Sequence, residues 1–378
     1  MPTWGALLQE LVDLQRKHQE AAEKGLLPPN PSSPHDILRR KYLKELSQRT
    51  GRATVVYASA WTHDKENLGG SALSVTLGDV QGFMEAVSNV EEKEVDLFLH
   101  SPGGSAEAAE AIMHYLRTRF DHIRVVVPLA AMSAATMMAL AADEIVMGAH
   151  SQLGPIDPQL TIMTPEGPRS APGQAIIDQF EKAKAECQDP ANIAAWMPII
   201  RGYGPGLLAT CQHSRDFAEE FATKSLESHM FSDQEDAHGK ALAAAEWFAD
   251  FKEFRSHGRR VDREAAREQG LKVIDLEDDP ELQDAMLSVH HAVNHTLSGT
   301  NAYKLIENHH GRAFILSAQP EIVLQGPIQL PPGATPPGGR PPGALPQGTV
   351  PQPAHGEPPK GNRAQRRAAE RASRKKSH

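Results

Sequence analysis

A serine in a turn of small residues is the first candidate for chemistry in this chain. Ser133 follows a β-branched run at Ile123–Val127 and precedes a helix-forming stretch at Ala134–Ala142. A serine at such a strand-to-helix turn presents its hydroxyl at the carboxyl edge of a sheet, where a helix N-terminus stabilises developing negative charge. The arrangement suits a nucleophilic serine that forms a covalent acyl intermediate.

A second turn, which contains two glycines, ends a neighbouring predicted strand. Val95–His100 is apolar, and the residues SPGG that follow are turn formers. Glycine lets a backbone N–H face outward without a steric penalty, so an N–H of Gly103 or Gly104 and the N–H of Ala134 would form an oxyanion hole. The alternative is that Ser133 only caps or packs a helix and the glycines only form a turn.

The elements that must position these turns alternate between strand and helix. Ser105 is predicted to cap a helix after the glycine turn, and Glu144–Met147 returns as a further strand. Two βαβ units in succession predict right-handed crossovers and an α/β fold with a layered parallel sheet. Thr54–Ala60 is the first clear strand, and residues 161–172, which contain several Pro and Gly, are expected to form a loop over the site.

Taken together, these segments resemble a known family. SPGG after a strand, the Met-Ser-Ala-Ala turn, ADEIVMG and SQLGPIDPQ are similar to the ClpP/crotonase-fold serine peptidases. The match is best with the serine dehydrogenase proteinase family, related to signal peptide peptidase A, over residues 54–314. The resemblance implies a ClpP/crotonase-like layered parallel sheet of repeated ββα/βαβ units, a peptide or protein substrate and assembly into homo-oligomers. It also implies Ser133 as nucleophile and Gly104 with Ala134 as oxyanion hole.

The general base stays open between two schemes. The family is described with a Ser, Asp and His triad, for which the matching positions are Asp157 in GPIDP and His257 in SHGRR, with His238 in reserve. Signal peptide peptidase A and its relatives use a Ser–Lys dyad instead, and Lys182 or Lys184 lies at a suitable distance after the serine. A lysine serves as base only where burial lowers its pKa, so we favour histidine, which titrates near neutral pH.

Composition limits the remaining possibilities. The two cysteines cannot form a disulfide framework, which favours a reduced, cytoplasmic setting. The 18 histidines are scattered, so we expect neither a metal site nor a cofactor. The first residues lack a secretory pattern. Val125–Ala142 is apolar enough to suggest a membrane span, but its place in the βαβ pattern favours a buried strand and helix, and we expect no membrane span.

Three regions are expected along the chain. Residues 1–50 form an N-terminal helical segment and residues 51–319 the peptidase-like domain. Residues 320–378 are a disordered linker rich in Pro and Gly, followed by a basic tail. Because the whole chain carries a formal charge of −9, the part before the tail is more acidic still. The tail is expected to solubilise or tether the protein, with an acidic partner or nucleic acid as the alternative.

The leading hypothesis is thus a cytoplasmic serine peptidase. Two other functions stay open. A crotonase-like acyl-CoA enzyme would also use backbone N–H groups to hold an oxyanion, although its chemistry needs placed carboxylates. A non-catalytic oligomeric scaffold would keep the fold and recruit partners through its basic tail.

Overall fold

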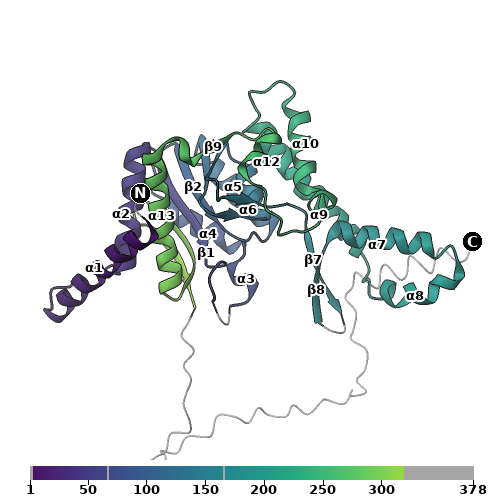
Figure 1. Cartoon of the computed structure of the whole chain (residues 1–378), viewed down its shortest axis with the longest axis horizontal. Coiled ribbons are helices and arrows are strands. Elements are labelled where there is room, and N and C mark those ends of the chain that lie inside the picture. The colour runs from purple at the N-terminus through teal and green to yellow at the C-terminus, as the bar shows by residue number, and fades with distance from the viewer. Residues whose placement is uncertain (1–2, 66–67, 165–166, 319–378) are drawn as a thin grey trace, which may run out of the picture. The chain divides into compact units, whose positions relative to one another are not determined.

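A mostly parallel sheet forms the centre of the protein. The computed structural model describes residues 3–65, 68–164 and 167–318, and the predicted tail lies outside these ranges. Within them, the main sheet has seven strands in the order β11-β10-β1-β2-β3-β5-β9 (Figure 1). The strand bounds are β1 Ala53–Ser59, β2 Glu94–His100, β3 His122–Val127, β5 Glu144–Met147, β9 Val273–Asp275, β10 Ala302–Asn308 and β11 Ala313–Ser317.

Five of these strands run parallel and two close one edge. β1, β2, β3, β5 and β9 pair in parallel, while β10 runs antiparallel to β1 and β11 antiparallel to β10. β1 is buried along its whole length, and β2 is buried from its second residue onward, as expected for strands covered on both faces. The predicted α/β fold with a ClpP/crotonase-like layered parallel sheet is confirmed, and each predicted strand is found within one residue of its expected bounds.

Helices cover both faces because side chains alternate along each strand. Val55 and Tyr57 of β1 pack in one core, whereas Val56 and Ala58 pack in the other. The first core includes helices α4, α5, α6, α9 and α10, and the second includes α2 and α13, which lie side by side in Figure 1. The bounds are α2 Pro34–Thr50, α4 Gly78–Val87, α5 Ala106–Arg117, α6 Ala134–Leu140, α9 Leu207–Ser228, α10 Ala237–Ala249 and α13 Pro280–Gly299.

The remaining elements are short or peripheral. Helix α1 packs Leu7 and Leu11 on α2, which starts at Ser33 with a capping box. Ser105 caps α5 as predicted, since its hydroxyl accepts a hydrogen bond from the N–H of Ala108 at 3.1 Å. The bounds are α1 Trp4–Glu23, α3 Gly70–Leu73, β4 Ala130–Ala131, β6 Gln152–Leu153, α7 Gly173–Glu186, α8 Pro190–Arg201, α11 Phe251–Phe254, α12 Arg263–Glu268 and the 3₁₀ turn η1 Leu276–Asp278.

The segment expected to be a loop is a β-hairpin instead. β7 Gln159–Thr164 pairs antiparallel with β8 Gly167–Pro172, so the loop predicted for residues 161–172 is wrong. Pro168 and Pro172 favoured the loop because proline cannot donate to a ladder. In a two-stranded ribbon, however, every strand is an edge strand, where proline is tolerated. Gly167 supplies the positive φ of 111° beside the turn.

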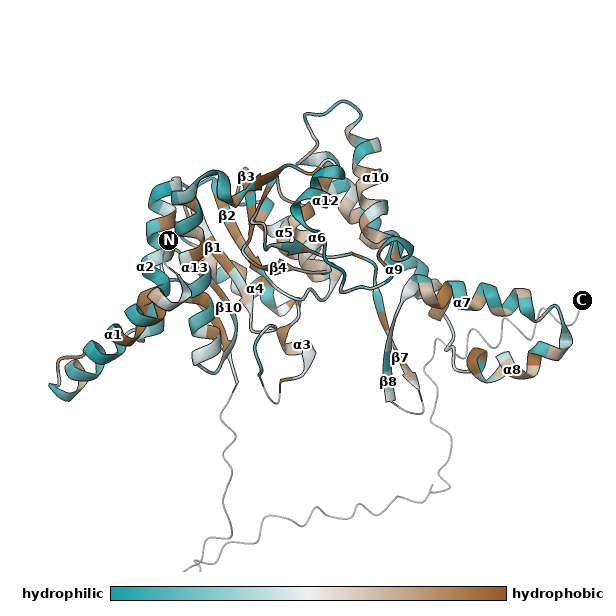
Figure 2. Cartoon of the chain, viewed as in Figure 1, coloured by the Kyte–Doolittle hydropathy of each residue, from teal (hydrophilic) through white to brown (hydrophobic). Residues whose placement is uncertain are grey.

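Hydropathy follows the layers of the fold. Figure 2 shows apolar colour concentrated on the strands of the main sheet and polar colour on the outer helices. Val125–Ala142, the apolar stretch noted in the sequence, is divided between the end of β3, the short strand β4 and helix α6. No helix in the described ranges combines the length and apolarity needed to cross a bilayer. The three-region division of the chain stays a prediction.

Buried histidines should make the fold sensitive to acid. His100 ends β2 in the protein interior, and burial lowers its pKa from 6.5 to about 4. Burial also holds the pKa of the neighbouring His290 well below its usual range. Between these pKa values the unfolded chain binds a proton that the folded protein does not, so stability falls as pH drops through this window. His100 alone accounts for about 3 kcal/mol when this window has been crossed.

Urea unfolding at pH 7, 5.5 and 4.5 measures this effect. The free energy of unfolding should decrease at each step, and the decrease should be smaller in His100→Leu, which has no group to protonate. Equal pH dependence in the wild type and this variant would show that His100 does not contribute.

Candidate active site

Ser133 occupies the turn between strand β4 and helix α6. Its backbone has φ 51° and ψ −119°, a conformation that residues with a Cβ rarely adopt. The turn is braced on both sides, since Met132 N–H donates to the carbonyl of Ser101 at 3.0 Å and Thr136 Oγ1 donates to the carbonyl of Ala131 at 2.8 Å. The side chain of Ser133 does not cap the helix. Its half-buried hydroxyl has no hydrogen-bond partner among residues 3–65, 68–164 and 167–318, so it is available for chemistry.

The glycine turn lies directly against this serine. A Cβ on Gly103 would stand 2.5 Å from the carbonyl oxygen of Met132 and 2.7 Å from Cβ of Ser133. A Cβ on Gly104 would stand 2.4 Å from the carbonyl oxygen of Val75. Both glycines also have positive φ, 92° and 153°. Only glycine therefore allows the two turns to approach this closely.

The three predicted oxyanion donors differ in whether their N–H groups are free. Gly103 N–H donates to Oγ of Ser101 at 3.2 Å. Gly104 N–H and Ala134 N–H have no acceptor in the part of the chain that the structure describes. Ala134 is the first residue of α6, where N–H groups lack a partner within the helix. Gly104 and Ala134 both line the same cavity as Ser133.

Asp157 and His257 are brought together from positions 100 residues apart. His257 Nδ1 lies 2.7 Å from Oδ1 of Asp157, whose side chain is only 3% exposed. Gln159 Nε2 donates to the other carboxylate oxygen at 2.7 Å. Both oxygens of Asp157 therefore have a hydrogen-bond partner, and the contact at Nδ1 orients the imidazole so that Nε2 is the nitrogen left for chemistry within the described ranges. Our reading of the sequence missed Gln159; its place two residues after Asp157 in an extended segment was the only signal.

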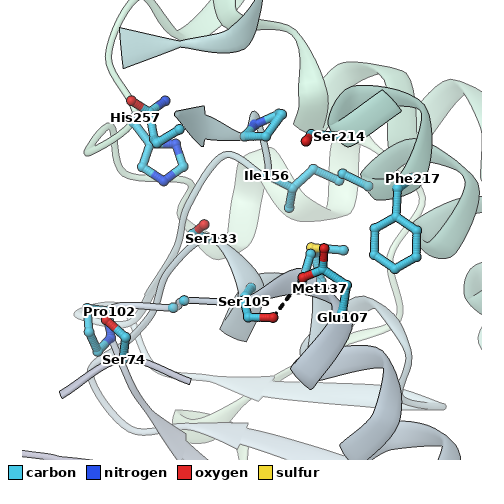
Figure 3. Close-up of a pocket in the computed structure, with 17 residues that line it drawn as sticks. Ser74, Pro102, Ser105, Glu107, Ser133, Met137, Ile156, Ser214, Phe217 and His257 are labelled. Carbon is cyan, nitrogen blue, oxygen red and sulfur yellow. Dashed lines mark hydrogen bonds between the residues drawn. The ribbon is translucent and has the colours of Figure 1, made fainter. Parts of the chain in front are cut away.

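Most of the candidate catalytic groups line one cavity. It has a volume of about 460 Å³, and Ser133, Gly104, Ala134 and His257 all line it. Figure 3 shows the ring of His257 on the side of the cavity that faces Ser133. The apolar part of its wall comes from α6, α9 and the segment before β7: Met137, Ile156, Pro158, Phe217 and Ala218. The cavity is wide enough for a peptide side chain beside the serine.

The other predicted bases lie elsewhere. Lys182 and Lys184 project from α7 with side chains 67% and 66% exposed, and they pair with Glu186 at 3.8 Å and Glu181 at 3.0 Å. His238, the reserve histidine, is exposed. None of the three lines the cavity that contains Ser133.

One group of metal-ligand types occurs in the described ranges, away from this cavity. Ligand atoms of Glu92, His309 and His310 lie within 4.8 Å of one another. Nδ1 of His309, however, accepts a hydrogen bond from the N–H of Thr54 at 3.2 Å. Its Nε2 then carries the proton and faces the carboxylate of Glu92 at 3.2 Å. A metal-binding histidine normally donates its second N–H to an acceptor, so the geometry disfavours a metal here.

Part of the chain is similar to known proteins. Residues 30–195 match the family of ClpP-like SDH-type serine proteinases. Two uncharacterized proteins of Methanocaldococcus jannaschii are similar. The first is 36% identical over 162 residues, which is 42% of this chain and 52% of that protein. The second is 32% identical over 127 residues, 32% of this chain and 42% of that protein. The chain thus spans about half the length of the curated relatives it matches.

Two solved structures of the 1510-N membrane-bound stomatin-specific protease are also similar. A serine-to-alanine mutant has 16% identity and a TM-score of 0.34, covering 56% of this chain and 79% of that one. A lysine-to-alanine mutant in complex with a substrate peptide has 16% identity and a TM-score of 0.25, covering 58% and 93%. The resemblance predicted from the sequence is supported by the family match, in which residues 30–195 are similar to the ClpP-like SDH-type serine proteinases.

Proposed function

We propose that this protein is a serine peptidase that hydrolyses peptide bonds through an acyl-enzyme on Ser133. The observation that supports it best is the hydrogen bond between Asp157 and His257 at 2.7 Å, with His257 lining the same cavity as Ser133. A triad needs a base that is held by an orienting acid and can reach the nucleophile, and the pair of Asp157 and His257 beside this cavity fits the acid and base positions. The family match over residues 30–195 supports the same class of reaction.

The proposed reaction proceeds in two steps. His257 Nε2 accepts the proton of Ser133 as Oγ attacks the carbonyl carbon, and the protonated imidazole gives that proton to the leaving amine when the C–N bond breaks. Water then attacks the acyl-enzyme with His257 again as base, releasing the acid and the free serine. Asp157 holds the tautomer with a proton on Nδ1 and stabilises the imidazolium.

The developing oxyanion would be held by the N–H groups of Gly104 and Ala134. Both are unpaired in the described ranges, and removing one such donor typically costs about 100- to 1000-fold in rate. Gly103 contributes differently, because its N–H is already bonded to Ser101 and its missing side chain makes room for the nucleophile. No hydrogen bond joins Ser133 and His257 in the described ranges, and catalytic hydrogen bonds often form fully only when a substrate binds.

The Ser–Lys alternative has less support. A lysine base needs burial to lose its proton near neutral pH, and both Lys182 and Lys184 extend into solvent beside carboxylates. We therefore assign the role of base to His257. Homo-oligomeric assembly, a cytoplasmic location and a partner for the basic tail stay predictions.

Labelling with a fluorophosphonate probe tests the proposal. The probe should form a covalent adduct on Ser133, identified by mass spectrometry of the labelled peptide. A folded wild-type protein that takes up no label would count against a serine hydrolase. Binding of a CoA thioester in a calorimeter, without labelling, would favour the acyl-CoA alternative.

A further inference from the structure

A buried ion pair lies beneath the glycine turn. Lys304 Nζ, from β10, lies 2.9 and 3.0 Å from the two carboxylate oxygens of Asp79 in the first turn of α4. The two side chains are 2% and 1% exposed. Tyr57 OH donates to the same carboxylate at 2.9 Å. Asp79 is the second residue of α4, which begins at Gly78. Burying both charges costs desolvation free energy that their attraction often does not recover, so a gain in stability does not by itself explain this pair.

Each partner of the ion pair also binds the backbone beside Val75. Lys304 Nζ donates to the carbonyl of Ser74 at 2.7 Å. Asp79 Oδ2 accepts from the N–H of Thr76 at 2.8 Å. The two residues that flank Val75 are thus tied to one buried charge pair. Val75 therefore has little freedom to move relative to the sheet.

Val75 in turn holds the glycine turn. Its N–H donates to the carbonyl of Gly103 at 2.7 Å, and its carbonyl accepts from the N–H of Ser105 at 3.0 Å. Gly104 lies between these bonds, so close that a Cβ would collide with the backbone of Val75. The N–H of Gly104 is the one left unpaired, at the wall of the cavity that contains Ser133. The direction of this N–H therefore depends on where Val75 is held.

We propose that Lys304 and Asp79 are positioning residues that aim the N–H of Gly104 at the oxyanion. The inference rests on the proposed peptidase function and extends it to β10, which lies outside the matched residues 30–195. An oxyanion donor acts only at about 2.7–3.1 Å from the charge that develops in the transition state. A misplacement of about 1 Å in a catalytic group can cost about 100-fold in rate. Ground-state binding of the peptide does not use this contact, so KM should change little.

The test compares two buried ion pairs that end on the same strand. Lys304→Met removes the proposed positioning pair. Arg39→Met removes the pair of Arg39 and Glu307, also fully buried, with Nε 2.7 Å from Oε2 and no contact with the glycine turn. Peptide hydrolysis, the rate of fluorophosphonate labelling and the melting temperature are measured for both variants and the wild type. Lys304→Met should lower kcat and the labelling rate about 100-fold with KM within twofold, and Arg39→Met should stay within threefold of the wild type in kcat.

Other outcomes overturn the inference in distinguishable ways. Equal losses of kcat in both variants, in step with their melting temperatures, would mean that Lys304 has only a structural role. A wild-type kcat in Lys304→Met would refute the inference and leave the proposed function intact, whereas an unlabelled wild type would refute both. If Lys304→Met does not fold, Asp79→Asn keeps the shape of the carboxylate and decides the matter: kcat about 10-fold lower supports the inference, and an unchanged kcat refutes it.

Discussion

Ser133→Gly is expected to abolish peptide hydrolysis and, at the same time, to stabilise the fold. The loss of activity should reach about 10⁶-fold, because the variant lacks the proposed nucleophile. The gain in stability follows from the backbone of Ser133, with φ 51° and ψ −119°. Holding a residue with a Cβ in this conformation costs about 1–3 kcal/mol, which glycine would avoid. Glycine also makes the unfolded chain more flexible, and this opposes the gain by about 0.5–1 kcal/mol. The net gain should be about 1 kcal/mol.

Ser133→Ala is the matched control for this prediction. Alanine removes the same hydroxyl but keeps the Cβ that makes the conformation unfavourable, so it should be equally inactive without becoming more stable. The free energy of unfolding in urea distinguishes the two variants. Equal stability of both would show that no strain is stored at this turn, and turnover within about 10-fold of the wild type in either variant would exclude Ser133 as the nucleophile.

His257→Ala should lower the rate of Ser133 acylation by about 10⁶-fold, the effect of losing the base of a triad. Asp157→Asn should cost about 10⁴-fold, because an amide in place of the carboxylate favours the wrong tautomer of the histidine. The basis is the 2.7 Å contact of Nδ1 with Oδ1, which leaves Nε2 as the ring nitrogen that could accept the proton of Ser133, and His257 and Ser133 line the same cavity. Single-turnover labelling and peptide hydrolysis measure both losses.

Lysine variants provide the control. Lys182→Ala and Lys184→Ala remove exposed charges that pair with neighbouring glutamates on α7, so acylation should stay within twofold of the wild type. If instead one of them abolishes acylation while His257→Ala remains active, the site is a Ser–Lys dyad and the lysine must move in the assembled or substrate-bound protein.

Local sequence patterns were enough to predict the central strands and the fold class of this protein. Continuous apolar runs, turn residues after them and helix caps such as Ser105 act over a few residues, so four strands of the main sheet, the α/β class and the Ser133 turn could be predicted from the sequence. The hairpin at residues 159–172 could not, because its prolines are tolerated only once it is known to stand as a two-stranded ribbon.

Contacts between residues far apart in the sequence could not be predicted from such local patterns. The sequence alone left several histidines and lysines as possible bases, and it took the folded chain to place His257 against Asp157, 100 residues earlier. Nothing near Lys304 pointed to Asp79, 225 residues before it, since an isolated lysine in a strand looks like any solvated charge. Periodicity and turn residues depend on neighbours in the sequence, so they can be recognised from the sequence alone. The partner of a buried polar group depends on the order of strands in the sheet, because every charge removed from water needs a partner nearby in the folded chain.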